Sequence, residues 1–205
     1  MNTDFLEFLV EESSMERFLR AVLPRFLPDG VSFDIHAFQG KDDLLDKLEG
    51  RLRGYAACLP ESTRIIVCVD RDDDDCIELK RQMEDLTSRV GLVSRNRAGD
   101  RPWQIVNRIC IEELEAWYFG DWPAVVSAYP RVSPTIPMKE CYRNPDTIKG
   151  GTWEAFERIL QRRGYFTAGL GKVTAAQLIG AEFVPSRCTS GSFKVFWDAV
   201  LEAVA

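Results

Sequence analysis

The sequence of 205 residues has one histidine, His36, and six cysteines, none of which forms a C-x-x-C pair. A single histidine cannot build a His-rich metal site, and scattered cysteines lack the ligand spacing of a zinc site. Cys68 and Cys110 lie within apolar runs, which is typical of buried thiols in a cytoplasmic protein rather than of a disulfide framework. We interpret His36, which alternates with apolar residues, as structural or exposed.

The chain also lacks long apolar runs and an excess of positive charge. No stretch approaches the roughly 20 apolar residues of a membrane-spanning helix. The acidic beginning of the sequence lacks the positive flank of a signal peptide, so we expect no membrane association. With 26 Lys and Arg against 32 Asp and Glu, the net charge is −6, which argues against broad basic patches. A nucleic-acid enzyme with an acidic metal site remains compatible with this charge, because bound cations offset it.

What the sequence does contain is an apolar run, residues 64–69, that ends in the acidic segment 70–75. Its two Ile and two Val predict a strand buried on both faces, as in a parallel sheet. Carboxylates 4 Å apart repel by roughly 4 kcal/mol at an effective dielectric near 20, so a cation is the simplest explanation. Oxygen ligands indicate Mg²⁺ or Mn²⁺. We assign Asp70 and Asp72 to the metal, and the later aspartates to the first turn of the next helix.

Hydrophobic periodicity predicts strands separated by helix-length spacers. The strands are expected at residues 5–10, 31–38, 64–69 and 104–111. A first helix is expected from a cap at Ser13 or Ser14 through Phe26, and a second from a cap at Asp42 or Asp43 through at least Leu52. Two further helices are expected at about 74–90 and 192–204. This order predicts an α/β fold, with a Rossmann-like parallel four-stranded sheet flanked by helices. Trp117, Tyr118 and Phe119 are expected in the core. Prolines then punctuate short helices, so we expect a core of residues 1–120 and a mostly helical extension of residues 121–205, packed as one compact unit.

Three of the four predicted strands end in acidic residues. They are Glu11 and Glu12, then Asp70 and Asp72, then Glu112, Glu113 and Glu115. Because the carboxyl ends of parallel strands share one edge of the sheet, we expect these acids to meet there. Ordinary helix capping is the alternative, since acids are favoured at helix starts. Glu113 and Glu115 diverge if the helix has already begun, and of the two we favour Glu113 as the inward-pointing ligand.

Cationic side chains suited to phosphate groups are also present. Lys41 follows a glycine at the end of the second strand, and Lys172 lies in a glycine-rich loop. Residues 94–104 are predicted to form an exposed loop in which arginines accompany Trp103, as in single-strand binders. Solvated turns and loops are the ordinary alternative. The candidate phosphate or nucleic-acid contacts are therefore Lys41, Arg71, Arg95, Arg97, Arg101 and Lys172.

These motifs resemble the Toprim domain of topoisomerases, bacterial primases and the overcoming-lysogenization-defect nucleases. The matching residues are Glu11 after the first strand and Asp70-Arg71-Asp72 after the third, while Glu12 stands where the pattern usually has glycine. Over nearly its full length the chain also resembles a family of uncharacterised bacterial proteins, known only as a domain of unknown function. The segments that carry this second resemblance are Val10-Glu11-Glu12-Ser13, Gln39-Gly40-Lys41, residues 69–76, residues 112–117 and Ser190-Gly191-Ser192-Phe193.

The resemblance implies a Toprim-like core that hydrolyses phosphodiester bonds of DNA or RNA, and an ATPase partner in phage defence. Asp70 and Asp72 would hold one or two Mg²⁺ or Mn²⁺ ions, and Glu113 or Glu115 would complete a second metal position. Glu11 would be a metal ligand or the general base, and Lys41 would contact the phosphate. Topoisomerases attack with a tyrosine from a separate domain. Because no such domain is apparent here, we expect water as the nucleophile.

Two other functions fit the same acidic residues. A response-regulator receiver would use Glu11 and Glu12 for Mg²⁺ and would accept a phosphoryl group on Asp70. A non-catalytic partner of an ATPase would keep the acids only for a metal that supports folding or regulation. Metal-dependent cleavage of a nucleic acid distinguishes the hydrolase from both.

Overall fold

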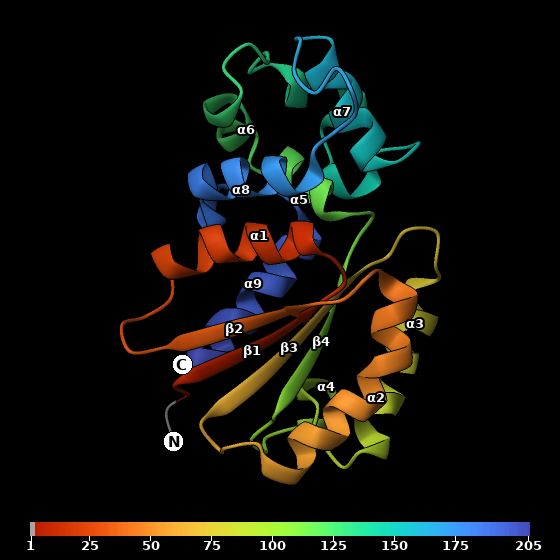
Figure 1. Cartoon of the computed structure of the whole chain (residues 1–205), viewed down its shortest axis with the longest axis vertical. Helices are drawn as coiled ribbons and strands as arrows, with labels where there is room; N and C mark the ends of the chain where they lie inside the picture. Colours follow the sequence, from red (N-terminus) through yellow and green to blue (C-terminus); the bar gives the residue numbers. More distant parts are fainter. Residues whose placement is uncertain (1–2) are drawn as a thin grey trace. The chain divides into compact units, whose positions relative to one another are not determined.

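In the computed structural model, which describes residues 3–205, four strands form one sheet (Figure 1). They are β1 (Phe5–Val10), β2 (Ser32–Ala37), β3 (Thr63–Asp70) and β4 (Ile105–Cys110), in the spatial order β2-β1-β3-β4. β1 runs parallel to both of its neighbours. The predicted α/β fold with a parallel four-stranded sheet is therefore confirmed, and the strand bounds differ from the predicted ones by at most one residue.

The strand order creates a topological switch point between β1 and β3. From β1 the chain continues to β2 on one side, and it then crosses to β3 on the other side of β1. The connections that leave the carboxyl ends of β1 and β3 consequently lead away in opposite directions. In open α/β sheets this divergence leaves a crevice between the two strands, and ligands bind there.

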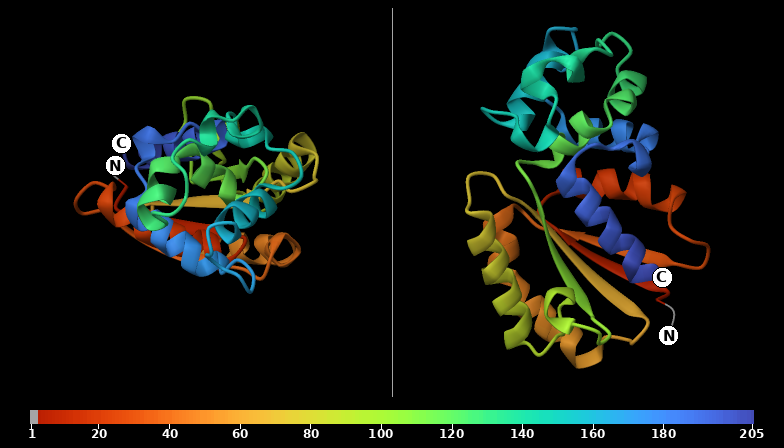
Figure 2. Two further views of the ribbon diagram at one scale, coloured as in Figure 1. Left: turned by 90° about the horizontal axis from the view of Figure 1, so that it is seen from above. Right: turned by 180° about the vertical axis from the view of Figure 1, so that it is seen from behind.

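Two helices, α2 (Lys41–Cys58) and α3 (Cys76–Arg89), lie side by side on one face of the sheet (Figures 1 and 2). Each buries apolar side chains at helical spacing, which is the pattern of a helix that covers a sheet. Burial of each such side chain contributes about 1.5–3 kcal/mol. The buried residues are Leu44, Leu48 and Leu52 of α2 and Leu79, Met83 and Leu86 of α3, which pack with residues of β1, β3 and β4.

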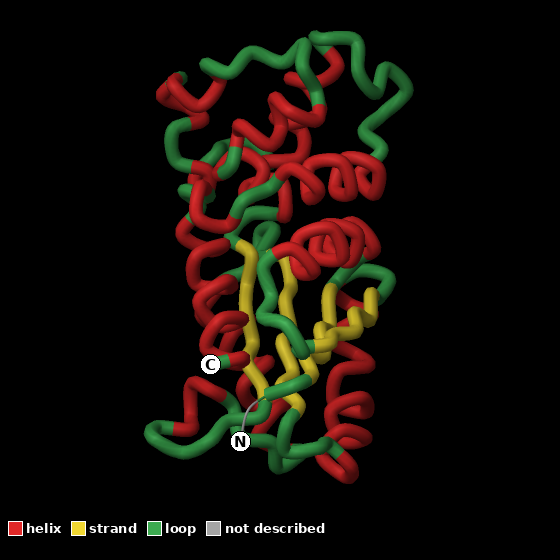
Figure 3. The backbone as a smooth tube through the Cα atoms, turned by 90° about the vertical axis from the view of Figure 1, so that its left-hand side faces the viewer, coloured by secondary structure: helices red, strands yellow, loops and turns green. Residues whose placement is uncertain are grey.

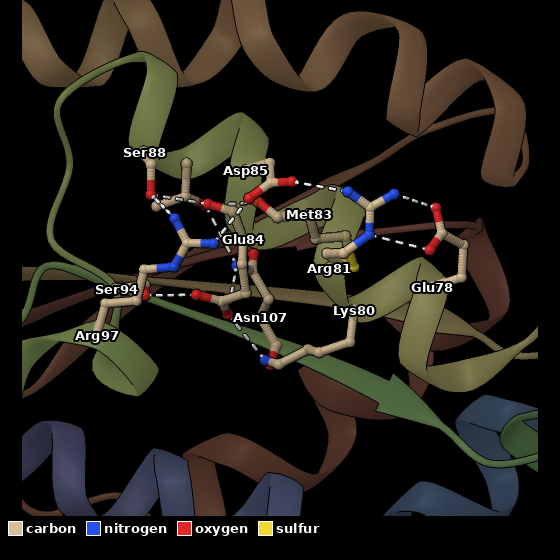
Figure 4. Close-up of polar contacts among 11 residues, drawn as sticks. Glu78, Lys80, Arg81, Met83, Glu84, Asp85, Ser88, Ser94, Arg97 and Asn107 are labelled. Carbon is tan, nitrogen blue, oxygen red and sulfur yellow. Dashed lines mark hydrogen bonds and ion pairs between the residues drawn. The ribbon is translucent and has the colours of Figure 1, made fainter.

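A polar network lies within this layer, centred on Glu84 of α3 (Figure 4). The Glu84 side chain accepts hydrogen bonds from Ser94 Oγ and Asn107 Nδ2, and it pairs with Lys80 Nζ at 3.0 Å. Burial by itself would raise the pKa of Glu84, but these donors together hold the pKa below its ordinary value. The network joins α3 to β4 and to the segment that begins at Ser94.

We expect Glu84→Gln to lower the free energy of unfolding at pH 7 by about 1–3 kcal/mol, because hydrogen bonds to a charged acceptor are lost. A carboxyl group whose pKa is lower in the folded state stabilises the protein above its unfolded pKa, and this contribution disappears as the pH falls through the folded pKa. The difference between wild type and variant should therefore shrink at about pH 3. Urea unfolding at both pH values measures it, and an equal difference at pH 7 and pH 3 would contradict the assignment.

Three local differences from the predicted elements have identifiable causes. α1 (Ser13–Val22) ends before Phe26, because Pro24 lacks an N–H group and the chain continues as a 3₁₀ turn over Leu23–Arg25. The cap of α2 is Gly40 rather than Asp42 or Asp43, and Asp43 instead accepts a hydrogen bond from the Gln39 N–H group. The segment 94–104 is not wholly loop, since it contains the single turn α4 (Arg95–Ala98).

The contacts divide the chain into two units. The first consists of the residues up to Ser13, Leu27–Ile109 and Asp198–Ala205, and the second of Ser14–Phe26 and Cys110–Trp197. We expected a division near residue 120. In the division by contacts, the segment of the first unit that contains β2, β3 and most of β4 ends at Ile109. Most of α1 belongs to the second unit, and the end of α9 (Gly191–Val204) belongs to the first.

The second unit is built from helices and loops (Figure 3). Its aromatic core includes Trp117, Tyr118 and Phe119, all at most 2 % exposed, as the sequence predicts. Besides most of α1 and the turn Leu23–Arg25, the unit contains α5 (Leu114–Gly120), α6 (Trp122–Ala128), α7 (Thr152–Gln161), α8 (Lys172–Glu182), the first half of α9 and the 3₁₀ turns Ile136–Met138, Glu140–Tyr142, Pro145–Thr147 and Pro185–Arg187. None of the helices within residues 3–205 has the length and apolar composition needed to cross a membrane.

Candidate functional site

Two acidic residues meet at the switch point of the sheet. Glu11 directly follows β1, and Asp70 is the last residue of β3. The backbone N–H of Asp70 donates a hydrogen bond to Glu11 Oε2 at 3.0 Å, although the two residues are 59 positions apart in sequence. Asp70 is 8 % exposed, so its side chain is largely buried at this edge of the sheet. The carboxyl-edge convergence that the sequence suggested is present for this pair.

Lys41 connects the start of α2 to the acids that follow β3. Its Nζ lies 2.7 Å from Asp72 Oδ2 and 2.7 Å from Asp74 Oδ2, and it donates a hydrogen bond to the Arg71 carbonyl oxygen at 3.0 Å. Gly40, with φ 104°, turns the chain from β2 into the helix, a conformation that favours glycine. The structure thus places Lys41 on the same edge of the sheet as Asp72, where the sequence put it.

The acidic segment after β3 is divided between the site and the helix. Asp72 has φ 48°, a left-handed conformation that aspartate tolerates better than most residues, and this turn separates Asp70 from the helix start. Asp75 is the cap of α3 and accepts hydrogen bonds from the Ile77 and Glu78 N–H groups at 2.9 and 3.0 Å. We expected the aspartates after Asp72 to lie at the start of the next helix. Asp75 does so, whereas Asp74 contacts Lys41.

Burial and charge act on Glu11 and Lys41 in different ways. Burial raises the pKa of Glu11, Asp72 adds to the effect, and the Asp70 N–H group and Lys41 only partly oppose it. Burial would lower the pKa of Lys41, but its hydrogen bonds to Asp72 and Asp74 outweigh burial and raise it. Lys41 is thus a strongly held positive charge beside the carboxylates of Asp72 and Asp74, and it also interacts with Glu11.

Glu113 and Glu115, the predicted second metal position, belong to the second unit. Glu113 precedes α5, and its Oε2 accepts hydrogen bonds from Thr152 Oγ1 at 2.8 Å and from the Trp153 N–H at 2.9 Å. It therefore caps the first turn of α7. Glu115 lies inside α5 and is 2 % exposed. Lys172, in the same unit, has its Nζ 5.3 Å from the centre of the Trp153 ring.

The arginines of the segment 94–104 contact residues of their own unit. Arg95 pairs with Glu202, Arg97 pairs with Asp85 at 2.7 Å, and Arg101 Nε donates to the Ala98 carbonyl at 3.2 Å. Figure 4 shows Arg97 between Asp85 and Ser88. Trp103 Nε1 also donates to Glu202, at 3.2 Å. These contacts fasten the segment to α3 and to the end of the chain.

The donor set at the switch point consists of carboxylate oxygens, the ligands that Mg²⁺ and Mn²⁺ prefer. Within residues 3–205, however, no group of three or more His, Cys, Asp or Glu side chains is arranged to hold a metal ion. The carboxylates at this edge of the sheet are suitable ligands for a hard divalent cation. In the structure, Lys41 pairs with two of them, Asp72 and Asp74.

The comparisons place the chain in a known family. Residues 10–201 match the sequence profile described as Domain of unknown function (DUF4276). The chain belongs to the DUF4276 family. The predicted membership of an uncharacterised family is confirmed, and the match includes Glu11, Lys41, Asp70 and Asp72 of the DUF4276 chain.

No curated protein matches this DUF4276 chain. Among solved structures, it is similar to the C-terminal region of the Burkholderia pseudomallei OLD protein, with 13 % sequence identity, a TM-score of 0.49 and coverage of 100 % of both chains.

Proposed function

We propose that this DUF4276 protein is a metal-dependent phosphodiester hydrolase of the Toprim type, acting on nucleic acid. The observation that carries the proposal is the meeting of Glu11 and Asp70 at the switch point between β1 and β3, with Asp72 and Lys41 on the same edge. An acidic pair and a lysine at the ligand-binding edge of an α/β sheet suit a charged substrate that arrives with a divalent cation.

Each side chain has a distinct role in this proposal. Asp70 and Asp72 would hold one or two Mg²⁺ or Mn²⁺ ions. When bound, the metal would offset negative charge that develops on the phosphate and would orient the attacking water. Glu11 is a further ligand, or it accepts the proton of that water on a carboxylate oxygen.

Lys41 changes partners in this mechanism. Lys41 pairs with both Asp72 and Asp74. A divalent ion held by Asp70 and Asp72 would neutralise Asp72 in place of Lys41, and the Lys41 ammonium group would then donate to a phosphate oxygen of the substrate.

The experiment is a cleavage assay on the purified full chain with supercoiled plasmid, single-stranded DNA and RNA, each with Mg²⁺, Mn²⁺ or EDTA. We expect cleavage of at least one of the three with a divalent ion and none with EDTA. The assay is repeated with the protein encoded beside this chain, since an ATPase partner is part of the proposal. Absence of cleavage under every condition would refute the hydrolase.

A non-catalytic, metal-binding regulatory module is the second candidate. It is favoured by the Lys41 contacts, which balance the charges of Asp72 and Asp74. This candidate predicts that Mg²⁺ or Mn²⁺ raises the melting temperature while every nucleic acid stays intact.

A further inference from the structure

The positive charge of this acidic protein is concentrated in one of its two units. The second unit contains 13 Lys and Arg against 10 Asp and Glu, while the rest of the chain has 13 against 22. The net charges are therefore +3 and −9, values that the overall charge of −6 conceals. A unit with a positive net charge inside an acidic protein is suited to bind an anionic partner.

Four exposed arginines of the second unit gather around the end of α7. Arg158 and Arg162 are one helical turn apart, and Arg163 follows directly. Arg131 reaches the same place from another loop, because its Nη2 donates to the Gly164 carbonyl oxygen at 3.1 Å. Its guanidinium also lies 4.1 Å from the centre of the Tyr165 ring. We call these five residues, Arg131, Arg158, Arg162, Arg163 and Tyr165, the α7 basic surface.

These arginines differ from those of the segment 94–104 in their partners. Arg95 and Arg97 are paired with Glu202 and Asp85. Among the residues that the structure describes, no carboxylate forms an ion pair with an arginine of the α7 basic surface. Like charges one helical turn apart also destabilise a helix, so Arg158 and Arg162 would be relieved by an anion.

The two acidic residues of α7 closest in sequence to Arg158 are directed elsewhere. Glu157 accepts a hydrogen bond from the Leu170 N–H group at 2.6 Å. Glu154, one helical turn before Arg158, turns its buried Oε2 toward Gly151. Neither of these two described carboxylates forms an ion pair with Arg158.

We propose that the α7 basic surface binds the phosphate backbone of a nucleic-acid strand. Planar guanidinium groups bind phosphate oxygens with two parallel hydrogen bonds, and several of them on one exposed helix end can follow successive phosphates. The Tyr165 ring contacts the Arg131 guanidinium and the Tyr129 ring, and the Arg131–Tyr165 pair adds a flat surface on which an unpaired base can stack. The inference relies on the proposed function for the class of substrate, but the binding itself requires neither metal nor cleavage.

The test measures binding of the full chain to a fluorescein-labelled single-stranded 20-mer and to the corresponding duplex, by anisotropy, in EDTA. We expect Arg162→Gln/Arg163→Gln to weaken binding about tenfold or more at 0.1 M salt and to reduce the slope of log K against log salt by about 1.4–1.8, since each lost phosphate contact removes 0.7–0.9. The matched control is Arg53→Gln/Arg81→Gln, which removes the same charge from two exposed arginines that pair with Glu49 and Glu78. It should change the affinity less than twofold.

Two results would overturn the inference. One is equal affinity and salt dependence for wild type and for the Arg162/Arg163 variant, with both correctly folded by circular dichroism. The other is binding to phosphatidylglycerol vesicles with none to either oligonucleotide. Failure of the proposed hydrolase is distinguishable, because it would abolish cleavage in Mg²⁺ while leaving this binding in EDTA intact.

Discussion

Asp70→Asn should lose metal-dependent cleavage by a factor on the order of 10²–10⁴. The substitution keeps the size and shape of the side chain but removes the negative charge that a divalent cation requires. Glu11 accepts its hydrogen bond from the backbone N–H of Asp70, and an asparagine at this position retains that donor. We therefore expect a folded protein with a wild-type circular dichroism spectrum. Cleavage is measured at several Mg²⁺ concentrations, so that weaker metal binding is separated from slower chemistry.

Asp73→Asn is the matched control, because Asp73 belongs to the same acidic segment and is exposed. It removes the same charge from the same loop, and we expect cleavage within about twofold of wild type, since exposed charges interact only weakly. If both variants lose cleavage equally, the effect is due to the overall charge of the segment. If Asp70→Asn cleaves like wild type, Asp70 takes no part in the mechanism.

Trp117→Ala should be among the most destabilising single changes in the second unit, at about 3–5 kcal/mol. The Trp117 side chain is fully buried. Its ring centre lies 5.0 Å from that of Phe196 and 5.1 Å from that of Phe193, and its Nε1 donates to Ser192 Oγ at 3.1 Å. For a chain of this size the loss corresponds to a fall in melting temperature of roughly 10 °C or more, measurable by calorimetry.

Trp117→Phe separates the packing of the ring from its hydrogen bond. Phenylalanine preserves most of the aromatic contacts but cannot donate to Ser192, so about 1–3 kcal/mol of destabilisation is expected. A Phe variant as unstable as the Ala variant would show that the hydrogen bond dominates. A wild-type melting temperature for the Ala variant would contradict the core position of Trp117.

The strands were predictable because each is a short apolar run bounded by turn residues and followed by a helix-length spacer. A strand such as β3 needs a nearly continuous series of Ile and Val when both faces are covered, and the sequence contains that series. Helix ends were less predictable. Pro24 ended α1 early, and Gly40 replaced the aspartates as the cap of α2.

The residues of the candidate site were also only partly predictable from the sequence. The acids at the strand ends could be found in the sequence, and so could Lys41. The arginines could not be ranked, because Arg95 and Arg97 are paired with acids 107 and 12 residues away, respectively, in the sequence. Whether an arginine is paired depends on such distant partners. No local sequence motif distinguishes the arginines of the α7 basic surface from arginines that are paired with acids.

The sequence by itself determined the α/β class, the parallel sheet and the family, since hydrophobic period and acidic strand ends are local properties of the chain. Only the tertiary structure decided the strand order β2-β1-β3-β4. That order puts β1 beside β3, and it therefore puts Glu11 within hydrogen-bonding distance of Asp70. Strand neighbours are chosen by the packing of whole helices and side-chain layers, which no short segment of sequence contains.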